Sequence, residues 1–252
     1  MNTILITGCN GNLALSIINF FSSNKKNYKI IGCDIQECFD PTRRLNGFEI
    51  DYFKTNLDSL ESIDELIEQL KSLDLLPDIL INNAVIDSVP LEKTFEDGMS
   101  INDFNIIFNV NVRAPIYIFK LLSNEWILRG QKGNVVNLST IYSKVSPDPS
   151  LYPSGFKKNI LYGSSKAALN SAFKQLSVMY SNYNIRINTL ILAGVESPYQ
   201  DYNFKKKYLE RIPIKRFLEI NEIFSAIFFL IDNTNSYMTG SELIIDGGYC
   251  NI

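Results

Sequence analysis

The stretch NTILITGCNGNLA, residues 2–14, runs from an apolar strand pattern, Asn2–Thr7, into a glycine-containing turn and the start of a helix. Gly8 and Gly11 let the backbone turn tightly and approach a bound group closely. The N–H groups that open the following helix attract an anion. A strand, this turn and a helix at the start of a sheet together predict a binding site for a pyrophosphate.

Six further strand patterns follow and alternate with helical patterns. They are Tyr28–Asp34, Gly47–Asp51, Asp78–Ala84, Gly133–Ser139, Ile185–Leu192 and Ser241–Gly247. Apolar residues at helical spacing predict a helix over Ser59–Leu73, and a longer, more buried one over 104–122 in spite of Pro115. The alternation predicts an α/β fold of Rossmann type. We expect one domain, residues 1–252, with a doubly wound parallel seven-stranded sheet and helices on both faces.

Composition narrows the class of protein. The net charge is −3, which argues against a nucleic-acid partner, and no apolar run approaches the roughly 20 residues of a membrane span. We therefore expect a cytoplasmic protein that binds no membrane. The chain has no histidine, which excludes a Ser-His-Asp unit, and its four cysteines form no C-x-x-C pair. We expect reduced cysteines and no metal site.

Tyr162 and Lys166 lie four residues apart in ILYGSSKAALN, residues 160–170. Residues at this spacing share one face of a helix. The unperturbed pKa of tyrosine is about 10, and a nearby cation favours the phenolate and lowers that pKa. A tyrosine tuned in this way can exchange a proton with a carbonyl or alcohol oxygen. The same spacing is common on solvated helices, so the pair gains its meaning from the rest of the chain.

Asp34 ends the second predicted strand. A carboxylate at this place accepts hydrogen bonds from both hydroxyls of an adenosine ribose and repels a 2′-phosphate. Glu37 adds negative charge, and the sequence places no Arg or Lys in the glycine turn or next to Asp34. The sequence therefore predicts NAD(H) as the cofactor in preference to NADP(H).

In order along the chain, the glycine turn, DILINNA, the helix with Asn111, VVNLST, YGSSK, RINTLILAG and the ending IIDGG resemble the short-chain dehydrogenase/reductase family. The likeness covers nearly the full chain. It implies hydride transfer between NAD(H) and a carbonyl or alcohol carbon, with Tyr162 as acid/base. It implies that Lys166 lowers the Tyr162 pKa and holds the nicotinamide ribose. It also implies that Asn111 keeps a helix open for a proton-relay water.

The resemblance assigns further residues. Thr140 takes the place of the usual serine that bonds the substrate oxygen, while Ser139 is expected to face the other side of its strand. The implied cofactor-binding residues are Gly8, Asn10, Asn12 and Leu13 at the pyrophosphate, Asp34 and Ile35 at the adenine ribose, Asn56 and Leu57 at the adenine, Asn83, Ala84 and Val85 beside the ribose, and Tyr162, Lys166, Ala193, Gly194 and Val195 near the nicotinamide.

Two segments, residues 143–159 and 197–216, are predicted to shape the substrate pocket at the carboxyl edge of the sheet. The second segment carries basic residues that either attract an anionic substrate or form a solvated helix face: Lys205, Lys206, Lys207, Arg211, Lys215 and Arg216. The resemblance implies a small-molecule carbonyl or alcohol substrate, with a sugar derivative as one candidate, and a homotetramer or homodimer. The long loop and part of the sequence near Thr140 resemble bacterial dehydrogenases of surface-sugar or flagellin-modification pathways.

Several residues depart from the common family pattern. Gly11 gives a glycine spacing typical of the extended subtype, Val85 replaces a glycine, and Ala193 replaces a proline. Two alternatives therefore stay open. One is an extended-type sugar-nucleotide epimerase or dehydratase, and the other is a non-catalytic NAD-binding regulator.

Overall fold

The computed structural model describes residues 2–23, 28–40, 50–87, 100–153, 158–196 and 201–252. Within them, seven parallel strands form one sheet in the order β3-β2-β1-β4-β5-β6-β7. The strands are β1 Asn2–Thr7, β2 Tyr28–Asp34, β3 Asp51–Lys54, β4 Ile79–Asn82, β5 Gly133–Thr140, β6 Ile185–Leu192 and β7 Glu242–Ile245. The strand order reverses between β1 and β4, and such a switch point is where open α/β sheets bind ligands. The predicted fold class is confirmed.

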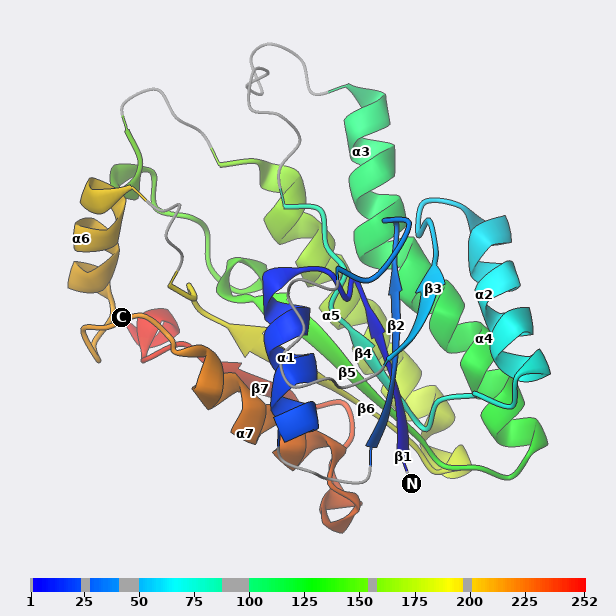
Figure 1. Cartoon of the computed structure of the whole chain (residues 1–252). Helices are drawn as coiled ribbons and strands as arrows, with labels where there is room; N and C mark the ends of the chain where they lie inside the picture. The colour runs from blue at the N-terminus through cyan, green and yellow to red at the C-terminus, as the bar shows by residue number, and fades with distance from the viewer. Residues whose placement is uncertain (1, 24–27, 41–49, 88–99, 154–157, 197–200) are drawn as a thin grey trace.

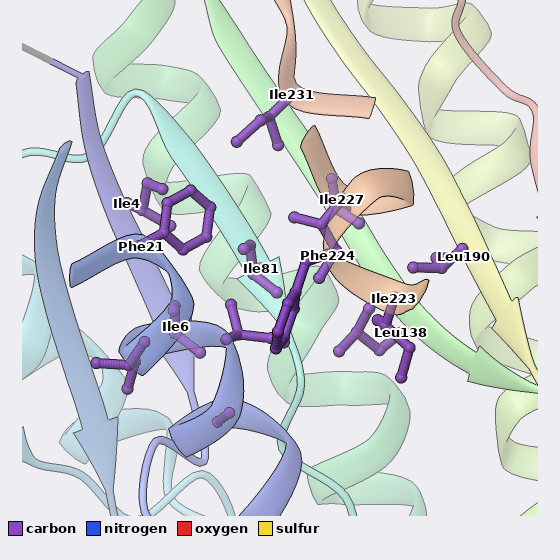
Figure 2. Packing of buried hydrophobic residues seen from close by; sticks show 14 of the residues in the cluster. Ile4, Ile6, Phe21, Ile81, Leu138, Leu190, Ile223, Phe224, Ile227 and Ile231 are labelled. Carbon is purple, nitrogen blue, oxygen red and sulfur yellow. The ribbon is translucent and has the colours of Figure 1, made fainter. Parts of the chain in front are cut away.

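Helices cover both faces of the sheet (Figure 1). One layer holds α1 (Asn12–Ser23) and α7 (Ile220–Ile231), and the other holds α2 (Leu60–Ser72), α4 (Ala114–Leu128) and α5 (Ile160–Tyr180). Between the first layer and the sheet, Ile6 and Ile81 of the sheet lie near Phe224 of α7 (Figure 2). Every residue of β5 is buried, as expected for a central strand covered on both faces.

The third strand differs from its predicted bounds. The prediction placed it at Gly47–Asp51, but β3 begins at Asp51 and ends at Lys54, and residues 47–49 lie outside the described residues. Among the described strands, β3 pairs with β2 alone, along its end from Ile31 to Asp34. The position of such an edge strand is set by this pairing, which no local pattern reveals.

The predicted long helix is interrupted by a wider turn. It consists of α3 (Ile101–Phe108), a π-helical turn η3 (Asn109–Arg113) and α4, with Pro115 in the first turn of α4. The run Ile101–Leu128 is the one described helix long and apolar enough to cross a membrane by length and composition. Residues of α4 such as Ile118, Leu122 and Trp126 are fully buried in the core, which accounts for that composition.

An aromatic cluster packs beyond the carboxyl edge of the sheet. We use this name for Phe204 and Tyr208 of α6 (Tyr202–Arg211), Phe217, and Tyr249 of η8 (Tyr249–Asn251). The ring of Tyr208 stacks on those of Phe204, Phe217 and Tyr249 with centroid distances of 5.4, 5.2 and 5.4 Å. Leu151 of η5 (Pro149–Leu151) joins the same buried group, so parts of both predicted pocket-shaping segments meet here.

Candidate active site

A cavity of about 560 Å³ opens at the carboxyl ends of the strands, where β1 and β4 lie side by side. Its size is typical of a pocket for a cofactor or a drug-sized ligand. The predicted site residues that line it are Gly8, Asn10, Asn12, Leu13, Asp34, Ile35, Asn56, Leu57, Asn83, Ala84, Val85, Thr140, Tyr162, Lys166, Ala193 and Val195. Of the described residues that were predicted, Asn111 and Gly194 lie outside this lining.

The glycine turn fits the close approach of a pyrophosphate. Gly8 has a φ of +65°, and a Cβ added there would lie 2.8 Å from the Ala84 Cα atom. The turn is fixed from two sides, because the Gly8 N–H donates to the Cys33 carbonyl at 2.8 Å and the Asn83 side chain donates to the Gly8 carbonyl at 3.1 Å. A turn with glycine at its closest point, followed by the N-terminus of α1, is a ready anion site.

Asp34 stands beside this turn at the end of β2. Its Oδ2 accepts the Asn10 N–H at 3.0 Å, and the carboxylate lines the cavity. In the folded chain a cation comes near Asp34 from another strand, because Lys54 of β3 is its register partner. Lys54 forms an ion pair with Glu37. The carboxylate, the turn and the exposed Ile35 form a set of groups that fits the adenosine half of a dinucleotide.

Three proposed catalytic side chains meet at the inner end of the cavity. Tyr162 and Lys166 come from α5, and Thr140 comes from the end of β5. The Tyr162 hydroxyl bonds the Thr140 side chain, and the buried Lys166 Nζ donates to the Leu138 carbonyl at 2.8 Å. Ser139 also lines the cavity, but its hydroxyl donates to the Ser143 hydroxyl at 3.4 Å. This geometry favours Thr140 over Ser139 as the partner of the substrate oxygen.

The electrostatics of Tyr162 differ from expectation. Burial raises its pKa to about 12, the charge of Asp87 adds to this rise, and the Thr140 hydrogen bond opposes it. Burial also lowers the pKa of Lys166 to about 8, while Asp87 acts in the opposite direction. The expected lowering of the Tyr162 pKa by Lys166 is therefore not met in this structure. The Lys166 ammonium is directed to the Leu138 carbonyl, and burial is the largest cause of the raised Tyr162 pKa.

An ion pair beside Tyr162 was not found by sequence reasoning. Asp87 Oδ1 lies 2.7 Å from Lys158 Nζ, and the same ammonium stands 5.1 Å from the centroid of the Tyr162 ring. Asp87 follows β4, whereas Lys158 precedes α5, so 71 residues separate them. Only the folded chain brings these two charges to the proposed acid/base.

Asp87 gives a test of this electrostatic arrangement. Its charge raises the pKa of Tyr162 and of Lys166, so Asp87→Asn should lower both. If Tyr162 is the predicted acid/base, its phenolate would be the base in the oxidative direction, and the activity of Asp87→Asn should rise at a lower pH than in the wild type. The measurement is the pH profile of kcat. Lys158→Met removes the charge that offsets Asp87 and should shift the profile the opposite way. Shifts of the same sign in both variants would contradict this account.

Asn111 holds the wall of the cavity together. It lies fully buried in the π-helical turn η3, and such turns often mark functional sites. Its Oδ1 accepts the Ile86 N–H at 2.8 Å, and its Nδ2 donates to the Ile86 carbonyl and the Ser165 hydroxyl. Asn111 thus ties the segment after β4 to the helix of Tyr162. The helix is widened at Asn111, where the resemblance implied an opening for a proton-relay water. The Asn111 side chain itself bonds to protein groups.

The basic residues of segment 197–216 are largely engaged by protein groups. Lys205 lies 3.2 Å from Glu196, and Arg216 lies 2.6 Å from Glu222. Two contacts join α6 to the neighbouring loop: Lys207 donates to the Ser150 carbonyl, and Arg211 pairs with Asp148. These contacts favour the reading of a solvated, structurally paired helix face over an anion-attracting lid.

Comparison with known proteins gives the family. A family described as enoyl-(acyl carrier protein) reductase matches residues 23–250. The chain belongs to the short-chain dehydrogenase/reductase family. It is 36% identical over 149 residues to an L-xylulose reductase of Caenorhabditis elegans, a match covering 57% of this chain and 56% of that protein. It is 25% identical over 254 residues to glucose 1-dehydrogenase 2 of Bacillus subtilis (strain 168), covering 98% and 93%.

A solved structure shows the same fold. The short-chain dehydrogenase of Leptospira borgpetersenii serovar Hardjo-bovis with bound NAD+ superposes with a TM-score of 0.86 at 24% identity, covering 99% of this chain and 92% of the other. The short-chain dehydrogenase/reductase described here is thus an oxidoreductase that acts on CH–OH and C=O groups by hydride transfer.

Proposed function

We propose that this short-chain dehydrogenase/reductase uses NAD(H) to interconvert a carbonyl and an alcohol, with Tyr162 as acid/base. The observation that carries the proposal is the convergence of Tyr162, Thr140 and Lys166 on one end of a cavity whose other end holds the glycine turn and Asp34. A bound nicotinamide would supply or accept the hydride there. The protein would supply alignment, hydrogen bonds and the proton.

Each side chain has a distinct part in this chemistry. In reduction, Tyr162 donates its hydroxyl proton to the substrate oxygen, and its high pKa keeps that proton in place at neutral pH. Thr140 donates a second hydrogen bond to the same oxygen and stabilises the charge that develops on it. Lys166, whose buried ammonium lies at the Leu138 carbonyl, would hold the nicotinamide ribose. Asn111 keeps α5 and the cavity wall in register.

The decisive experiment measures turnover. Purified protein is mixed with NADH and a panel of small carbonyl compounds, or with NAD+ and the matching alcohols, and the absorbance of NADH is followed. The relatives named for xylulose and glucose support a sugar derivative as substrate. Binding of NADH without turnover on any carbonyl, alcohol or sugar nucleotide would favour the non-catalytic regulator instead. Redox-neutral conversion of a sugar nucleotide would favour the epimerase or dehydratase.

The preference for NAD(H) rests on Asp34. Asp34→Asn keeps an oxygen for the Asn10 N–H but removes the charge that would repel a 2′-phosphate. We expect the ratio of NAD(H) to NADP(H) affinity to fall by about tenfold or more, since hydrogen bonds to charged groups contribute about 1.5–3 kcal/mol. Isothermal titration with both cofactors measures this ratio. Asp51→Asn, on the neighbouring strand, is the control and should leave it unchanged. An unaltered ratio in Asp34→Asn would remove Asp34 from this role.

The remaining assignments concern assembly and compartment. Large apolar side chains are exposed on α4 and α5, including Leu128, Val178 and Met179, which supports a homodimer or homotetramer packed through these helices. Sedimentation velocity distinguishes these from a monomer. The free thiols of Cys9, Cys33, Cys38 and Cys250 support a reducing compartment such as the cytoplasm.

A further inference from the structure

We propose that Tyr208 is a positioning residue that fixes the loop Ala193–Val195 against the nicotinamide half of the cofactor. This inference rests on the proposed function, since it takes the inner end of the cavity as the place of the nicotinamide. The residue acts from α6, outside the cavity lining. Neither the glycine turn nor the Tyr162 helix gives any indication of this role.

The loop after β6 presents its residues alternately. Ala193 and Val195 line the cavity, whereas Gly194 between them faces away from it. The Gly194 N–H donates to the Tyr208 hydroxyl at 2.7 Å. The Gly194 carbonyl accepts the Leu218 N–H at 3.3 Å. Both backbone groups of the central residue are thus held by the chain that follows, and the two flanking residues are presented to the cavity.

Tyr208 and Gly194 are fitted to each other. A Cβ added at Gly194 would lie 2.9 Å from the Tyr208 hydroxyl oxygen and from the ring carbon that bears it. Gly194 is therefore needed for the close approach of the Tyr208 ring. Gly194 does not line the cavity, so the cavity does not explain its missing side chain. The nearby Tyr208 ring does.

The ring of Tyr208 is itself held in place. Tyr208 is 2% exposed and is the buried residue of α6, and its ring lies within the aromatic cluster between Phe217 and Tyr249. Burial raises the pKa of its hydroxyl to about 12, so the hydroxyl stays protonated at physiological pH. A rigid ring with a fixed hydroxyl gives the loop a defined position rather than a flexible tether.

The test compares two tyrosine-to-phenylalanine variants and two ligands by isothermal titration. Tyr208→Phe keeps the ring and removes the acceptor of the Gly194 N–H. We expect its affinity for NADH to fall by about tenfold, the effect of one lost hydrogen bond on a displaced loop. Its affinity for ADP-ribose, which lacks the nicotinamide, should stay within about twofold of the wild type, because the glycine turn and Asp34 are untouched.

Tyr249→Phe is the matched control. The Tyr249 ring stacks on Tyr208, and its hydroxyl is buried without a hydrogen-bond partner among the described residues. Its removal should leave both affinities unchanged. Equal loss of NADH and ADP-ribose affinity in Tyr208→Phe, or no loss of either, would overturn the role of Tyr208. The proposed function would still stand. A wild-type protein that binds neither ligand would overturn the proposed function and this inference together.

Discussion

Tyr162→Phe should reduce turnover by about 10²- to 10⁴-fold, the usual contribution of a positioned acid or base. The phenylalanine keeps the ring on α5 but cannot give a proton to the substrate oxygen or accept one from it. NADH affinity should stay within about tenfold of the wild type, because at most one hydrogen bond to the cofactor is lost. Steady-state kinetics and isothermal titration measure the two effects separately.

The control for this variant lies on another helix. Tyr117 of α4 is partly exposed, donates to Asp64 at 2.8 Å and does not line the cavity. Tyr117→Phe should leave kcat unchanged. Turnover of Tyr162→Phe within about tenfold of the wild type would remove the acid/base assignment, whatever its NADH affinity.

Gly8→Ala should abolish most cofactor binding, with NADH affinity falling by about thirtyfold or more. The new methyl group would lie 2.8 Å from the Ala84 Cα atom, and both sites are backbone that cannot rotate away. The turn must therefore shift, and with it the N–H groups that would hold the pyrophosphate. Left-handed backbone and steric overlap together should lower the free energy of unfolding by about 2–5 kcal/mol.

Gly130 supplies a control with the same backbone geometry. Its φ is +62°, close to the +65° of Gly8, but a Cβ added at Gly130 would meet no heavy atom within 4 Å. Gly130→Ala should therefore show only the conformational cost, about 1–2 kcal/mol, with unchanged NADH affinity. Thermal unfolding and isothermal titration on both variants separate backbone strain from collision. Equal behaviour of the two variants would contradict the collision at Ala84.

Local sequence patterns predicted the bounds of strands that are covered by helices on both faces of the sheet. β1, β2 and β6 have the predicted bounds, since covered parallel strands are apolar along nearly their whole length. The family resemblance predicted most of the residues that line the cavity. What the sequence did not reveal depends on pairing across long separations. Lys54 becomes the strand neighbour of Asp34 only through the pairing of β3 with β2, and Lys158 pairs with Asp87 across 71 residues.

The pKa of Tyr162 shows the same limit. Sequence reasoning weighed one neighbouring charge, Lys166, and predicted a lower pKa. Burial and the charge of Asp87 are properties of the assembled site, and together they raise the Tyr162 pKa to about 12. Spacing along a helix identifies which groups share a face, but it does not give the dielectric environment in which they titrate.

The bonds from α6 to the loop around Ser150 have a practical consequence for protein engineering. Lys207 and Arg211 attach that loop to α6, and Tyr208 attaches α6 to the strand end at Gly194. A chimera that imports only one of these segments from a homologue would leave unmatched contacts on the other. Designers who wish to alter substrate scope should transplant residues 144–153 and 201–212 as one cassette and retain the tyrosine–glycine pair at its base.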